Sequence, residues 1–185
     1  MMSELTQAMI INGAVLAAVL HNDLGRARKV GSFRILRPLL MAGAVIPLFI
    51  DRPVTQGAGL ALELAGLAAG LLGGMAALRL LTVYRDPATG QPASRAGFGY
   101  GLLWTLVIGA RAAFSYGSYH WFSGPLARWM TVHQVAPAAI TDALIFMAVA
   151  MVLTRTLGLA GRAARLPQPA ITRTANGAYA TTARS

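Results

Sequence analysis

The chain of 185 residues and 19.4 kDa is strongly apolar: 56% of its residues are hydrophobic, the mean hydropathy is +0.56, and only 12% are charged. Soluble domains contain about 25% charged residues, so this composition argues against a water-soluble globule. The chain has no cysteine, which excludes disulfides, thiol nucleophiles and cysteine-bound metals. The net charge of +10 does not indicate nucleic-acid binding, because the basic residues lie between long apolar runs and form no basic face.

Five apolar runs follow one another along the chain. A bilayer core of about 30 Å requires roughly 20 mostly apolar helical residues. The runs cover residues 3–20, 35–50, 57–83, 97–119 and 135–157. We therefore predict an all-α fold, a polytopic transmembrane helical bundle of five spans formed by residues 1–157 as one domain. The second run reaches only about 24 Å at 1.5 Å per residue and contains Pro38 and Pro47, so a kink or a partial re-entry is open there.

The basic residues predict the orientation of these spans, because lysine and arginine favour the cytoplasmic side of a membrane. Of the 16 basic residues, 13 lie in the loop after the first run, around the end of the third run and its loop, or at the end of the fifth run and in the tail. In this arrangement Arg52 and Arg128 lie outside and Arg111 lies within a span. The N-terminus is therefore expected outside and the C-terminus in the cytoplasm.

The loops and the tail carry local signals of their own. Gly124-Pro125 precedes residues 126–130, for which a short helix on the membrane surface and a plain connecting loop are both open. Asp86-Pro87 and Gly90 are typical of a turn after the third run. After residue 157 the apolar periodicity ends and prolines and threonines follow, so residues 158–185 are predicted to form a flexible cytoplasmic tail.

Small residues in the third run predict a close helix contact. Lipid tails give helices no hydrophobic reason to associate, so tight packing depends on residues that let backbones approach. Gly66, Gly70 and Gly74 recur every four residues and therefore lie on one face of a helix. We expect that face to pack against another helix. A helix of the same chain is favoured over a second subunit, because five helices in so short a chain must mostly pack on one another.

Four predicted spans each contain a polar residue: Asn12, Glu63, Arg111 and Asp142. A charged side chain inside a bilayer costs about 2.5–3.5 kcal/mol on insertion scales, so such residues usually face the bundle interior and pair. At 1.5 Å per residue all four come to a similar depth, roughly 9–14 Å from the outer end. We therefore predict one polar layer, in which the Arg111 guanidinium bridges the carboxylates of Glu63 and Asp142.

Two interpretations of this layer are open. The charged side chains fasten three helices together without any further role. Alternatively, they form a solute or proton site, because two carboxylates and one guanidinium leave one carboxylate in excess.

No catalytic or cofactor motif accompanies the layer. The glycine-rich residues 97–101 lack the preceding strand and the following lysine of a phosphate-binding loop. His120 and His133 show no metal-ligand or haem-ligand spacing, and no nucleophile motif joins Ser115 or His120 to Asp142. We expect no catalytic residue, no metal and no cofactor.

The order of several features points to a family. A basic loop leads to Arg37-Pro38, an acidic residue lies in a Gly/Leu-rich span, residues 79–86 close that span with Arg-x-x-Thr-Val-Tyr-Arg-Asp, and Arg111 and Arg155 lie in the next two spans. In this order the features resemble the CcdC-like family of small bacterial membrane proteins, over roughly residues 26–157. The resemblance implies a multi-pass helical protein of the bacterial plasma (inner) membrane without established activity. The family's name alludes to cytochrome c maturation, but a chain without cysteine has no thiol for that role.

The sequence thus predicts a non-enzymatic, multi-pass plasma-membrane protein that acts as an accessory or scaffold subunit. The alternative is a small transporter or proton-linked solute-binding protein that uses the polar layer. The predicted partners are the lipid bilayer and a protein partner or second copy of the chain, and no nucleic acid.

Overall fold

The computed structural model describes residues 4–23, 28–49, 57–167, 170–173 and 179–182, and this part of the chain is mostly helical. Its elements in chain order are α1 (Glu4–Asp23), β1 (Arg28–Lys29), α2 (Ser32–Phe49), α3 (Gly57–Arg79), β2 (Leu81–Arg85), β3 (Pro92–Ala96), α4 (Phe98–His120), α5 (Ser123–His133), α6 (Pro137–Ala164), β4 (Ala170–Arg173) and β5 (Tyr179–Thr182). Each of the five predicted apolar runs therefore forms a helix. For the segment after Gly124-Pro125 a helix and a plain connecting loop were both open, and the structure has the short helix α5 there.

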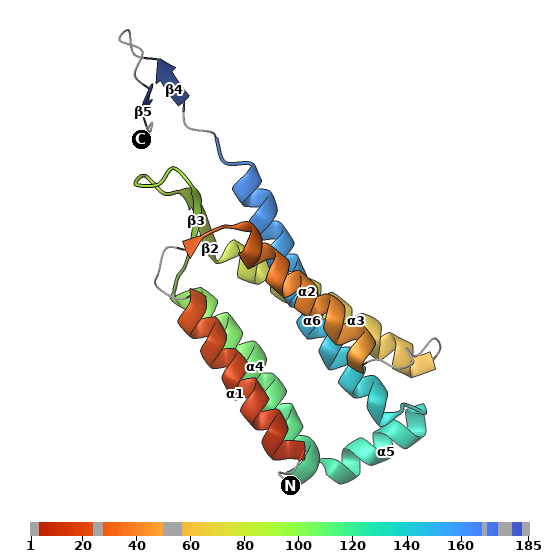
Figure 1. The fold of residues 1–185 in the computed structure, drawn as a ribbon. Coiled ribbons are helices and arrows are strands. Elements are labelled where there is room, and N and C mark those ends of the chain that lie inside the picture. The colour runs from red at the N-terminus through yellow and green to blue at the C-terminus, as the bar shows by residue number, and fades with distance from the viewer. Residues whose placement is uncertain (1–3, 24–27, 50–56, 168–169, 174–178, 183–185) are drawn as a thin grey trace.

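The helices form two groups (Figure 1). α1 lies antiparallel beside α4, whereas α2 and α3 both pack on α6, with α3 parallel to α6. The three-stranded sheet of β1, β3 and β2 lies at one end of these groups, and α5 crosses the opposite end from α4 to α6. We call these two ends the sheet end and the α5 end.

Among the described residues, three helices are long and apolar enough to cross a membrane: α3, α4 and α6. Much of their apolar surface is exposed: the side chains of Leu72 and Leu106 are 64% and 61% accessible. Within the described part of α1 the qualifying apolar stretch is shorter, Asn12–His21. α2 continues through Pro38 and Pro47 and measures about 27 Å. Five crossing helices therefore stay a prediction.

The fold is not purely helical, which corrects the all-α prediction. The third run, predicted as a span over residues 57–83, stops being helical at Arg79, and β2 and β3 then pair as an antiparallel hairpin from Leu81 opposite Ala96 to Arg85 opposite Pro92. Residues 82–84, Thr-Val-Tyr, are β-branched or aromatic and favour a strand. Residues 92–96 carry no such signal and join the sheet through their backbone.

The predicted turn between these strands is present and is closed by Asp86. Its carboxylate accepts hydrogen bonds from the Ala88 backbone N–H at 2.9 Å and from the Thr89 hydroxyl at 3.0 Å. Gly90 has a φ of +65°, a left-handed conformation that glycine adopts at little cost.

The last helix continues beyond the predicted end of the fifth run. α6 ends at Ala164, so residues 158–164 are helical and are not part of a flexible tail, whereas the position at which the span leaves the membrane stays a prediction. Gly158 does not end the helix because it lies inside a packed contact, where an added Cβ would meet the Leu78 side chain. Beyond the helix, β4 and β5 pair as a second antiparallel hairpin.

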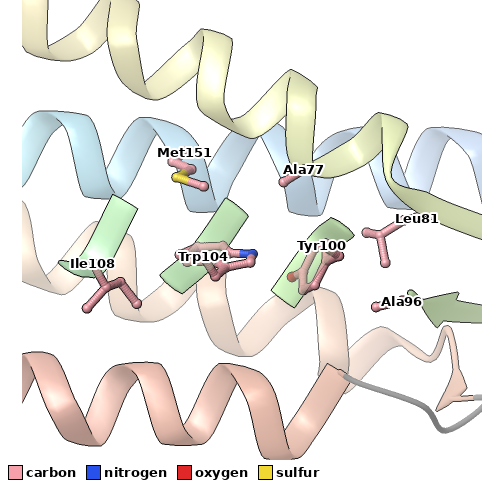
Figure 2. Packing of buried hydrophobic residues seen from close by; sticks show 7 residues of the cluster. All are labelled: Ala77, Leu81, Ala96, Tyr100, Trp104, Ile108 and Met151. Atoms are coloured by element: carbon pink, nitrogen blue, oxygen red, sulfur yellow. The ribbon is translucent and has the colours of Figure 1, made fainter. Parts of the chain in front are cut away.

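A buried cluster joins the two helix groups near the sheet end (Figure 2). Its members are Ala77, Leu81, Ala96, Tyr100, Trp104, Ile108 and Met151. Leu16 and Val19 of α1 pack against it, so the cluster includes contacts from both groups and from the sheet. The aromatic rings of Tyr100 and Trp104 are 6.2 Å apart and tilted, and the Arg155 guanidinium lies 5.4 Å from the Tyr100 ring centre.

Two arginines at the sheet end bind backbone oxygens, one linking α6 to α3 and the other linking β2 to the residues just after α6. Arg162, in the last turn of α6, donates a hydrogen bond to the carbonyl oxygen of Leu78 in α3 at 2.7 Å. Arg85, at the end of β2, donates to the carbonyl oxygens of Leu166 at 3.3 Å and Pro167 at 2.8 Å, just after α6.

The glycine face of α3 meets the backbone of α6. Gly66, Gly70 and Gly74 lie against the backbone oxygens of Ala143, Met147 and Met151. A Cβ atom at Gly70 would meet the Met147 carbonyl oxygen and lie 2.8 Å from the Ala150 Cβ. The contact predicted for this face is therefore made within the chain, and no larger residue fits there without moving the helices apart.

Replacing Gly70 by alanine is expected to destabilise the protein. Alanine gains about 1 kcal/mol of helix propensity over glycine, but overpacking a tight contact costs typically 1–3 kcal/mol, and here the clash is with backbone. Gly109→Ala in α4 is the matched control, because nothing lies within 4 Å of its added Cβ. Thermal unfolding of the purified variants should lower the midpoint for Gly70→Ala and leave it equal or higher for Gly109→Ala. Equal shifts in the same direction would contradict the close contact.

Candidate functional site

The four polar residues of the predicted layer lie in two different places. Glu63 on α3 and Asp142 on α6 are both buried, at 5% and 7% exposure. Because Gly66 lies against Ala143 in this parallel pair of helices, the two carboxyl groups come within about one helical turn of the same level. Both side chains have interaction partners in the structure.

Arg111 and Asn12 lie on the wall of a cavity instead. Neither Glu63 nor Asp142 is among the described residues that line it. The lining positions of α6 recur on one face of the helix, and at 100° per residue Asp142 lies on nearly the opposite face. The structure therefore buries Glu63 and Asp142 at a similar level of α3 and α6 and places Arg111 and Asn12 on the wall of the cavity, so the four residues do not form the single predicted layer.

The cavity has a volume of about 620 Å³. Its walls come from α1 and α4 on one side and from α6 on the other, and α5 contributes Leu126 and Met130. In Figure 1 the sheet lies at one end of the two helix groups, and α5 runs between them at the other end.

The chemical character of the wall changes along the cavity. Trp104 and Met151 belong to the buried cluster and so mark the end of the cavity nearest the sheet. From Trp104 to Tyr119 the wall of α4 measures about 22 Å, with Arg111 near its middle. Between Trp104 and Arg111 the α4 lining consists of Val107 and Ile108, and it has no aliphatic hydroxyl or charge. Beyond Arg111, the lining of α4 includes Ser115, Ser118 and Tyr119, and Thr141 lies on α6.

Arg111 is the only charged side chain among the described lining residues. It is partly buried, and its guanidinium offers five hydrogen-bond donors and no acceptor. A cavity with an apolar section and a section with donors can bind a molecule that has both an apolar and a polar part.

The two histidines near the α5 end are engaged by their own helices. The His120 ring stacks on Tyr116 with centres 4.3 Å apart, and the His133 ring stacks on Trp129 with centres 4.8 Å apart. In each case the imidazole Nδ1 lies within hydrogen-bond distance of the backbone oxygen of the same aromatic residue. The described part of the chain contains no group of three His, Cys, Asp or Glu side chains that could hold a metal ion.

The hydroxyl groups that share a wall with Arg111 are not among the predicted site residues. Ser115 and Ser118 follow Arg111 by four and seven residues, so they lie on the same face of α4. This polar stripe in an otherwise apolar helix is a signal that could have found the cavity wall. Thr141 on α6 carries no such signal, because its place depends on how α6 packs.

Comparison of the chain with protein-family models, with curated proteins and with solved structures found no match. The resemblance to the CcdC-like family therefore stays a prediction.

The separation of Arg111 from Asp142 predicts additive effects of mutation. In a double-mutant cycle of Arg111→Gln and Asp142→Asn, the changes in unfolding free energy should add to within about 0.5 kcal/mol, as for residues without shared partners. Tyr100→Leu with Arg155→Gln is the positive control, because these two side chains form a cation–π contact. A favourable coupling well above 0.5 kcal/mol between Arg111 and Asp142 would restore the predicted bridge.

Proposed function

We propose that the protein is a non-enzymatic integral membrane protein that binds a small molecule or lipid inside its helical bundle. The observation that carries this proposal is the cavity of about 620 Å³ between α1, α4, α5 and α6. Ligand sites usually enclose about 300–1,000 Å³ and combine apolar walls with a few placed polar groups, as this wall does. The proposed site is the cavity at Arg111 and Asn12, and Glu63 and Asp142 act in helix packing.

The proposed location is the bacterial plasma membrane, crossed by α1, α2, α3, α4 and α6, with the N-terminus outside. Support comes from the three qualifying helices with exposed apolar surface and from the basic residues of the sheet end, which include Arg28, Lys29, Arg85 and Arg162. By the positive-inside rule that end belongs in the cytoplasm. The resemblance to the CcdC-like family agrees with this location.

A second candidate function is an accessory or scaffold subunit, with a protein partner or a second copy of the chain. It is favoured by the burial of Glu63 on α3 and Asp142 on α6, because these two carboxyl groups are buried in the bundle and neither lines the cavity. A scaffold has no need of a cavity, so filling the cavity separates the two candidates.

The orientation can be tested with single cysteines, because the chain has none of its own and each introduced thiol reports alone. In intact cells a membrane-impermeant maleimide should label Ser123→Cys in α5 and Ser3→Cys near the N-terminus. It should not label Gln91→Cys in the hairpin loop until the cells are opened. Labelling of Gln91→Cys in intact cells would reverse the proposed orientation, and protection of Ser3→Cys would remove α1 as a crossing helix.

The cavity can be tested through Trp104, which lines it and is 6% exposed. With Trp121 and Trp129 changed to phenylalanine, Trp104 is the remaining tryptophan. Uncharged 9,10-dibromostearyl alcohol, added to the protein in nanodiscs, should quench Trp104 fluorescence saturably, because bromine quenches tryptophan at contact. Ala148→Phe, which fills part of the cavity, should weaken this quenching about 10-fold, in line with overpacking costs of roughly 1–3 kcal/mol.

Ala110→Phe is the matched control, because Ala110 is exposed on α4 and is not among the described lining residues. Its quenching curve should equal that of the parent. Quenching that never saturates, or that Ala148→Phe leaves unchanged, would rule out the binding function and leave the scaffold candidate.

A further inference from the structure

We infer that the ligand of this cavity is a single-chain amphiphile with an anionic head group, of which a long-chain fatty acid is the simplest example. The inference rests on the proposed binding function and adds the chemical class of the ligand. It also assigns head-group recognition to Arg111.

The charge of the cavity selects the sign of the head group. Arg111 is the only charged side chain among its described lining residues, and no carboxylate shares that wall. A guanidinium stays protonated in apolar surroundings, and a charge held there is stabilised by an opposite charge. An anionic group is therefore the complementary occupant, and charge-assisted hydrogen bonds to it are roughly twice as strong as neutral ones.

Neutral donors surround the position of the head group. Ser115 lies one helical turn from Arg111 on the same wall of α4. Asn12 of α1 lies at about the level of Arg111, since α1 runs antiparallel to α4 and Leu16 and Val19 pack against the cluster that contains Trp104. Hydroxyl and amide donors beside a guanidinium match the several acceptor sites of a carboxylate.

The apolar section of the cavity selects a hydrocarbon chain. From Arg111 to Trp104 the wall runs for about 10 Å, with Val107 and Ile108 on α4 facing Met151 and Val152 on α6. Methionine side chains adapt readily to irregular apolar shapes. A small inorganic anion would use Arg111 and leave this section without contacts, whereas an uncharged lipid would bring no opposite charge to the guanidinium. A single molecule with an anionic group and a hydrocarbon chain can contact both Arg111 and the apolar section.

The test compares three probes on the protein that keeps Trp104 as its one tryptophan, in nanodiscs of uncharged lipid. They are 9,10-dibromostearate with its carboxyl group ionised, the uncharged 9,10-dibromostearyl alcohol, and inorganic phosphate as a competitor. The carboxylate should quench at a concentration at least 10-fold below that needed for the alcohol. Arg111→Gln should remove this difference, and Arg111→Lys, which keeps the charge, should retain part of it. Phosphate should not displace dibromostearate at matched concentrations.

The outcomes separate the role of Arg111, the binding function and the class of ligand. Unchanged quenching by the alcohol in Arg111→Gln would show that this variant keeps an intact cavity, so that a lost carboxylate preference is assigned to the guanidinium. Equal quenching by both brominated probes in the parent protein would overturn the inference and leave the proposed binding function standing. Quenching by neither would overturn both. Displacement of dibromostearate by phosphate would overturn the amphiphile in favour of a small-anion site.

Discussion

The backbone contact between α3 and α6 is the constraint on which the other features depend. Gly66, Gly70 and Gly74 let α3 approach α6 until backbone oxygens lie where side chains would otherwise stand. This contact occupies one face of α6, and it places Glu63 and Asp142 in the same part of the bundle. The face of α6 that lines the cavity adjoins this contact and shares Met147 and Met151 with it, so the packing of α3 decides which residues of α6 a ligand can meet.

The cavity forms because the two helix groups are in direct contact near the sheet but are held apart by α5 at the other end. Near the sheet, the cluster around Tyr100 and Trp104 joins α4 to α3 and α6. At the other end the 11 residues of α5, about 16 Å as a helix, stand between the end of α4 and the start of α6. Gln134 ends α5 in a left-handed conformation and Pro137 starts α6, so the chain turns sharply there and α5 remains a separate crossing segment.

The sequence predicted the helices and the glycine face well, because an apolar run and a four-residue glycine spacing are local signals. It could not predict which way Asp142 faces, because apolar residues occur on every side of α6 and its rotation depends on two neighbours, α2 and α3. The same limit explains why Arg111 was assigned to two carboxylates at a similar depth, since depth follows from counting residues and facing does not. The strand at residues 92–96 was missed because Pro-Ala-Ser-Arg-Ala pairs through its backbone and shows no apolar alternation.

The hydrogen bonds of Arg85 and Arg162 near the ends of α3 and α6 also have an electrostatic effect. Parallel helices end side by side, so their partial negative charges lie together and repel each other. Arg162 from α6 binds a carbonyl in the last turn of α3, and Arg85, which follows α3, binds carbonyls just past α6. Arg162 thus offsets the macrodipole of α3, and Arg85, from the strand that follows α3, places a second cation just past the end of α6. Arg85 and Arg162 are among the basic residues that would orient the chain in a bilayer, and they also reduce the repulsion between the neighbouring ends of α3 and α6. Membrane orientation and helix packing therefore both require a positive charge at these two positions.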